Sequence, residues 1–172
     1  LSKLYGNTGE VAASSDAISY TCYGGVSIAD LDCDGEFEIV MSDSGDSICF
    51  DEDLNVLWTT SSYTSESHCA VLTDVTGDKN LEVVILRQDM SSPYDGGIYV
   101  YNADGSLVPG MYDGTLGLGC HCQPAVYDID LDGHVEVLTC YGGTYCSVWD
   151  LTDWSEDTTL EKGSEPPDIA NV

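Results

Sequence analysis

The chain has 172 residues, of which 31 are acidic and only 4 are lysine or arginine, which gives a formal charge of −27 at neutral pH. This acidic excess excludes nucleic acids and anionic membrane surfaces as natural partners, because both bind basic protein surfaces. Hydrophobic residues make up 42% of the chain, enough for a core, and they occur in strand-sized runs that are too short for membrane insertion.

Residues 1–19 precede the first repeated motif and contain the apolar stretch Val11-Ala12-Ala13 together with Ile18. We predict that this N-terminal segment is separate from the repeats and can be exchanged as a strand with a neighbouring molecule. The chain begins with Leu1 rather than methionine, so we expect a processed form, a fragment, or the ordered part of a longer protein.

Residues 30–38, 74–82 and 128–136 repeat one nine-residue pattern with oxygen-bearing side chains at positions one, three, five and nine. Gly35 and Gly133 stand at position six, where a sharp backbone turn is easiest without a Cβ atom. Such a loop suits Ca²⁺, which takes about six to eight oxygen ligands in loose geometry. Position seven offers its backbone carbonyl, and water completes the shell. We therefore predict about three bound Ca²⁺, the weakest in loop two. The predicted ligands are Asp30, Asp32, Asp34, Glu36 and Glu38 in loop one, Asp74, Thr76, Asp78, Asn80 and Glu82 in loop two, and Asp128, Asp130, Asp132, His134 and Glu136 in loop three.

Short apolar runs rich in β-branched residues flank each loop and predict strands on both sides. Further apolar runs joined by Asp-, Asn- or Gly-rich turns follow in every unit. An EF-hand is excluded, because it needs a twelve-residue loop between two helices. The first loop position recurs at 30, 74 and 128, intervals of 44 and 54 residues that fit one four-stranded blade each. We predict an all-β fold of three four-stranded antiparallel propeller-type blades, open or completed by other copies, at about residues 20–65, 66–115 and 116–154.

The loop Asp30-Leu-Asp32-Cys-Asp34-Gly-Glu-Phe-Glu38, its flanking strands and the turn Tyr101-Asn-Ala-Asp-Gly105 resemble the FG-GAP (or VCBS) repeats of integrin α-chain heads and many secreted proteins. The resemblance covers roughly residues 20–154. It implies β-propeller blades whose loops hold Ca²⁺. The chain departs from the family pattern at Thr76 and Lys79 of loop two, and three blades are fewer than the closed propellers of this family contain.

The eight cysteines are an even number, which predicts about four disulfides formed in an oxidising, extracellular compartment. The best local pair is Cys140 with Cys146, because a hairpin can bring them together. The alternative is a soft-metal site built from His68-Cys69 and Cys120-His121-Cys122, although these lack the two-residue gap of zinc knuckles.

One further segment lies between the first two predicted blades, and another follows the third. Residues 59–67 are rich in serine and threonine and predict either a solvated linker or a site of O-glycosylation. Residues 155–172 predict an acidic tail, disordered or acting as a docking arm that orders on a partner.

No catalytic motif stands out, and calcium binding already accounts for the carboxylate pairs, so we do not expect an enzyme. Trp58, Trp149 and Trp154 are possible stacking faces for glycans, although aromatic residues at strand spacing more often belong to the core. The sequence therefore favours a secreted, calcium-binding structural repeat protein that self-assembles into a filament or matrix. The alternative is a fragment of a larger adhesion or carbohydrate-binding β-propeller, to which further blades of a longer chain would belong.

Overall fold

The computed structural model describes residues 1–15, 25–42, 46–61, 69–89, 95–113, 123–141, 145–153 and 156–161. This part of the chain forms strands and turns, and it contains no helix long and apolar enough to cross a bilayer. The strands are β1 (Ser2–Leu4), β2 (Val11–Ser14), β3 (Val26–Ala29), β4 (Glu38–Ser42), β5 (Asp46–Phe50), β6 (Val56–Ser61), β7 (Val71–Thr73), β8 (Glu82–Asp89), β9 (Asp95–Tyr101), β10 (Leu107–Asp113), β11 (Ala125–Tyr127), β12 (Glu136–Tyr141), β13 (Tyr145–Asp150) and β14 (Glu156–Glu161).

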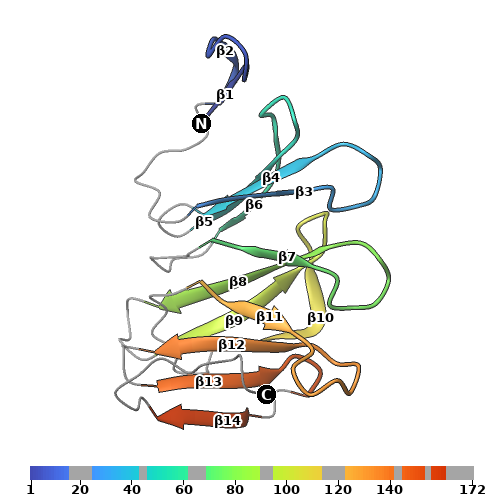
Figure 1. The fold of residues 1–172 in the computed structure, drawn as a ribbon, viewed down its shortest axis with the longest axis vertical. Coiled ribbons are helices and arrows are strands. Elements are labelled where there is room, and N and C mark those ends of the chain that lie inside the picture. Colours follow the sequence, from blue (N-terminus) through green and yellow to red (C-terminus); the bar gives the residue numbers. More distant parts are fainter. Residues whose placement is uncertain are drawn as a thin grey trace.

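The strands pair with their sequence neighbours into antiparallel sheets. Strands β3–β6, β7–β10 and β11–β14 form three sheets of four strands each, called repeats one, two and three below, and β1 pairs with β2 in a separate hairpin. Figure 1 shows the three sheets following one another along the long axis of the molecule, with the β1–β2 hairpin beyond repeat one. The predicted all-β, antiparallel class is therefore confirmed, and the sheets do not close into a ring.

The N-terminal strand is paired within its own chain. Ser2 lies opposite Ser14 in the register of β1 and β2, and the Ser15 N–H donates to the Leu1 carbonyl at 2.9 Å. The strand exchange expected for residues 1–19 therefore stays a prediction.

Repeat two is covered on both of its faces, which explains why β8 is apolar without alternation. Val83 and Ile85 pack toward repeat one together with Val40, whereas Val84 and Leu86 pack toward repeat three. All four β8 side chains are fully or almost fully buried. A continuous apolar run of this length is what a strand needs when sheets lie on both sides of it.

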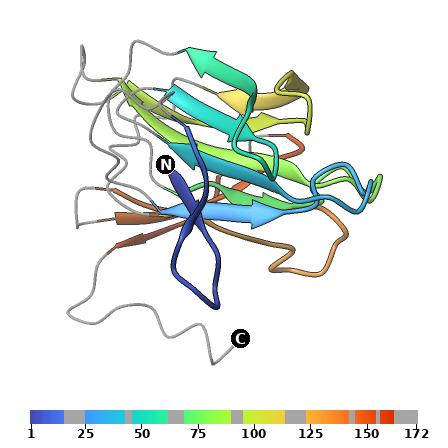
Figure 2. The same ribbon diagram turned by 90° about the horizontal axis from the view of Figure 1, so that it is seen from above.

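The first strands of the three sheets are neighbours. Strand β7 contacts both β3 and β11, and the Ser27 hydroxyl of β3 donates to the Ala70 carbonyl just before β7 at 2.6 Å. Each loop that follows a first strand therefore emerges on the same side of the stack, as both views of the ribbon show (Figures 1 and 2).

Trp58 on β6 joins repeat one to the β9–β10 turn of repeat two. Its indole N–H donates to the Ala103 carbonyl at 2.7 Å, and its ring stacks on Tyr101 with centroids 6.3 Å apart. Gly105, at φ +82°, lies so close to the indole that a Cβ there would meet the ring at 2.7 Å. This tryptophan is thus used in packing between repeats rather than as an open stacking face.

The predicted cysteine pairing is wrong for four residues. Cys33, Cys49, Cys69 and Cys146 carry free thiols, so the predicted bridge from Cys146 to Cys140 is not formed, although the two positions face each other across β12 and β13. The other free thiols have different neighbours: Cys49 lies in an aliphatic cluster, and the Cys33 sulfur donates to the Lys79 carbonyl. Cys22, Cys120 and Cys122, with His68 and His121 of the alternative metal site, lie outside the described residues.

Candidate metal centres

Two backbone positions in the left-handed region shape each of the three loops. Position six is left-handed in every loop, as expected for Gly35 and Gly133, but position four is left-handed as well. These two left-handed residues, with one residue between them, reverse the direction of the chain. Position nine therefore comes back close to position one. Sequence reasoning missed position four, because cysteine and leucine at two of the three sites give no signal for this conformation. The φ angles are 61°, 79° and 64° at Cys33, Gly77 and Leu131, and 97°, 83° and 95° at Gly35, Lys79 and Gly133.

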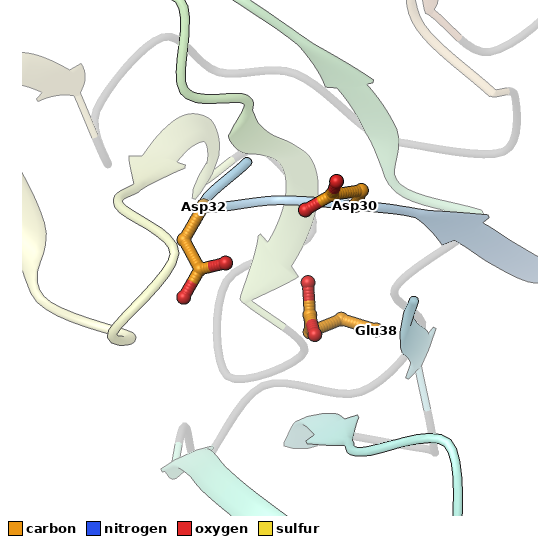
Figure 3. A group of neighbouring side chains, drawn as sticks. All are labelled: Asp30, Asp32 and Glu38. Carbon is orange, nitrogen blue, oxygen red and sulfur yellow. The ribbon is translucent and has the colours of Figure 1, made fainter. Parts of the chain in front are cut away.

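Carboxylates from positions one, three and nine converge in loops one and three. Asp30, Asp32 and Glu38 place one oxygen each within 4.8 Å of the others, and Figure 3 shows the three side chains pointing toward one another. Asp128, Asp130 and Glu136 form the same group in loop three. The first two acids follow the first strand of a sheet, and the glutamate is the first residue of the next strand, so the group closes a β-hairpin.

The glutamate at position nine is held by the backbone of its own loop. One carboxylate oxygen accepts the N–H of position two, from Leu31 to Glu38 at 2.7 Å and from Ile129 to Glu136 at 2.6 Å. Glu82 accepts from Val75 at 2.8 Å in the same way. This bond fixes the orientation of the carboxylate and explains why three glutamates tolerate burial in the fold.

Burial disfavours the charged form of these three glutamates. Desolvation raises the pKa of Glu38, Glu82 and Glu136 above the ordinary 4.5, the loop aspartates raise it further, and the backbone hydrogen bonds only partly oppose the shift. A raised pKa means that the negatively charged form is disfavoured in the folded protein. A cation among the carboxylates would reverse this, because an opposite charge favours ionisation.

Position five does not join the convergent groups. Asp34 and Asp132 instead accept the N–H of position seven, from Glu36 and from His134 respectively, each at 2.8 Å. The His134 ring is engaged elsewhere, with its Nδ1 2.9 Å from the Thr152 hydroxyl. The structure thus brings together three of the five predicted ligand positions in loops one and three.

Loop two differs, as its sequence departure predicts. Thr76 replaces the acid at position three, and its hydroxyl lies 3.5 Å from a Glu82 oxygen. Both Asp74 oxygens accept backbone N–H groups, from Gly77 at 2.7 Å and from Lys79 at 3.0 Å. Within the described part of loop two, no three acids converge as they do in loops one and three. Asp78, Asn80 and Glu82 line a polar hollow with the turn residues Asn102–Asp104.

The surroundings of one carboxylate oxygen indicate whether a cation fits among the acids of loop three. Asp128 Oδ2 accepts the Gly133 N–H at 3.1 Å, but Asp128 Oδ1 is buried without any hydrogen-bond partner among the described residues. A buried carboxylate oxygen without a partner is costly, and such atoms are rare in folded proteins. The donor set around it consists of oxygens alone, which suits a hard cation such as Ca²⁺ or Mg²⁺ rather than a soft metal.

Residues 74–139, from the start of loop two into β12, match the family model described as FG-GAP-like repeat. This stretch is similar to an FG-GAP-like repeat. The resemblance predicted from the loop and its strands is therefore confirmed over this stretch, which contains loops two and three. No curated protein matches the chain.

Among solved structures, the V. cholerae biofilm matrix protein Bap1 is similar to 83% of this chain, with 16% sequence identity and a TM-score of 0.38. The match covers 29% of the Bap1 chain.

Proposed function

We propose that the chain is a calcium-binding structural repeat protein whose loops are rigidified by Ca²⁺. The observation that carries the proposal is the buried, unpartnered Asp128 Oδ1 within a converging group of three carboxylates. Loop one has the same group. We expect loop two to bind a third ion more weakly, because Thr76 replaces a charged ligand and ligand charge is a main determinant of affinity. Bound cations would neutralise the charge of the buried glutamates. They would also hold the two strands of each hairpin together at the point where the second strand begins.

The proposed blade arrangement explains how the sheets meet. Each four-stranded sheet would be one propeller-type blade, with its first strand nearest the axis. The contacts of β7 with both β3 and β11 support this arrangement, since inner strands of neighbouring blades are adjacent in a propeller. The same contacts favour the second candidate, a fragment of a larger adhesion or carbohydrate-binding propeller, in which further blades would continue the stack.

The proposed role is extracellular and structural rather than catalytic. Short, largely exposed nine-residue loops suit the weak calcium affinities of extracellular modules, which are in the range of about 10⁻⁴–10⁻³ M. The free thiols remove cysteine pairing as support for this location, so the proposal rests on the loops and on the acidic composition. We propose that copies assemble into a filament or matrix, because apolar side chains are exposed at both ends of the stack, Ile28 and Phe37 at one end and Ile129 and Leu131 at the other.

Calorimetric titration with Ca²⁺ tests the metal proposal directly. The unaltered chain should bind about three ions, two of them more tightly than the third. Asp128→Asn should remove one of the tight sites and leave loop one unaffected, whereas Glu10→Asn, on the exposed β1–β2 connection, should leave the stoichiometry unchanged. Binding of no ion by the unaltered chain would end the proposal.

A further inference from the structure

The two joints between consecutive repeats use the same two loop positions. In the first joint, Leu31 at position two is fully buried in a cluster with Leu81, which stands at position eight of the next loop. The Leu81 N–H also donates to the Leu31 carbonyl at 2.8 Å. In the second joint, Val75 at position two is 9% exposed and shares a cluster with Val135 at position eight. At both joints, position two of one loop and position eight of the next therefore belong to the same apolar cluster.

A second contact accompanies the first. The Cys33 sulfur at position four of loop one donates to the Lys79 carbonyl at position six of loop two, at 3.2 Å. Loops one and two therefore contact each other directly across the first joint, in addition to the packing of the sheets behind them.

Each end of the stack presents one half of this joint without its counterpart. Phe37, at position eight of loop one, is 59% exposed, and Ile129, at position two of loop three, is 41% exposed. At position four of loop three, Leu131 is 78% exposed. Among the described residues, loop three thus offers positions two and four, and loop one offers position eight.

We propose that a second copy of this chain completes the joint, with Ile129 of one copy against Phe37 of the next and Leu131 over Gly35. The proposal rests on the proposed self-assembly and assigns the surface that performs it. Its occupant follows from continuity, because positions two and eight of consecutive loops already share an apolar cluster at both joints inside the chain. The contact is heterologous, so copies add head to tail and form a filament, or a ring if the rotation closes.

The N-terminal hairpin leaves this surface accessible. Leu1 packs beside the cluster of Met41, Ile48 and Phe50 on the face of repeat one that points away from repeat two. With the hairpin in that place, Phe37 keeps the exposure given above, and Ile28 on the same face is 61% exposed. The loop-one edge of this face therefore stays exposed, although its centre at Met41, Ile48 and Phe50 is already buried.

Repulsion between copies sets the conditions for assembly. A formal charge of −27 opposes association at low ionic strength, and divalent cations bound in the loops would lower that charge next to the contact. Association should therefore need Ca²⁺ at moderate salt.

Sedimentation velocity of the whole chain in millimolar Ca²⁺ tests the contact with two end variants, Phe37→Asp and Ile129→Asp. The unaltered chain should sediment as oligomers larger than a dimer, and each variant alone as a monomer. An equal mixture of the two variants should form a dimer and nothing larger, because each contributes one intact end. Leu107→Asp on β10, with an exposure of 39% close to that of Ile129, is the matched control and should assemble like the unaltered chain.

The outcomes separate this contact from the proposed function. If the end variants assemble as the unaltered chain does, or if the mixture stays monomeric, the contact is overturned while self-assembly stands. An unaltered chain that binds Ca²⁺ in calorimetry yet stays monomeric overturns the contact and the assembly, and leaves calcium binding in place. Circular dichroism of each variant checks that it remains folded. Dimer formation in the mixture is a second check, because a misfolded variant could not restore the contact.

Discussion

Replacing Glu136 by glutamine should have opposite effects on stability with and without Ca²⁺. The amide oxygen of glutamine can still accept the Ile129 N–H, so the packing and the hydrogen bond of the native side chain are retained. What changes is the charge of a group that is 1% exposed and lies among Asp128, Asp130 and Asp150. In chelator, the variant should melt above the unaltered chain, because folding no longer has to bury that charge.

With Ca²⁺ present, the same substitution should lower the melting temperature. A site held at 100 times its dissociation constant contributes about 2.7 kcal/mol to stability, and in a chain of this size that corresponds to about 5–10 °C. Losing a charged ligand from loop three should remove most of this amount. Differential scanning calorimetry in excess EGTA and in millimolar Ca²⁺ measures both values.

The matched control is Glu10→Gln, the same chemical change at an exposed residue of the β1–β2 hairpin. Its melting temperature should shift little in either condition, since such surface changes are usually within about 0.5 kcal/mol. A Glu136→Gln variant that melts lower by the same amount with EGTA and with Ca²⁺ would refute the reasoning, because the glutamate would then act through packing alone.

Three further predictions concern protons, backbone strain and thiols. In chelator, stability should increase as the pH falls from 7 toward the ordinary glutamate value of 4.5, because the raised pKa of the three buried loop glutamates makes the folded state bind more protons than the unfolded one. In Ca²⁺ the trend should reverse, since protons compete with the ion; urea titrations at several pH values measure both. Lys79→Gly should stabilise the metal-free chain by about 1 kcal/mol, because φ +83° strains a residue with a Cβ, whereas Gly35→Ala should destabilise it. A maleimide reagent at neutral pH should modify exposed Cys33 within minutes but spare Cys49, because burial raises the pKa of the Cys49 thiol to about 12. Mass spectrometry of the modified peptides measures both reactions, and modification of Cys49 in the folded protein would contradict this prediction.

Much of the fold can be predicted from the sequence because its strands are short and locally specified. The run Val83-Val84-Ile85-Leu86 has no alternation, and a strand of this kind is covered on both faces, as the structure shows for repeat two. The loop spacing likewise determines which hairpins close, because the position-nine glutamate begins the second strand of each. In both cases neighbouring residues in the sequence contain the required information.

Contacts between distant residues could not be predicted in the same way. Nothing near Cys33 or Leu131 marks position four as left-handed, because neither residue type favours that conformation. The expectation of paired cysteines came from their number, whereas the positions of the thiols depend on sheet packing that a count does not contain. The hydrogen bond from position two to the position-nine glutamate was also missed, because it depends on the turn of the loop and not on side-chain type.

The converging carboxylates of the loops conflict with the stability of the folded chain, and this conflict points to a function. A sequence selected for stability alone would not converge three carboxylates and bury one of them in a chain of charge −27, because each of these choices disfavours the folded state. Asp128 Oδ1, buried and without a partner, shows that the backbone does not relieve the conflict by itself. A cation would relieve every part of it at once: the repulsion, the raised pKa values and the unpartnered oxygen. Since Leu31 and Leu81 link loop one to loop two by a hydrogen bond, order gained in one loop would also stabilise its neighbour. We therefore propose that the stiffness of the stack depends on the ion concentration of its surroundings.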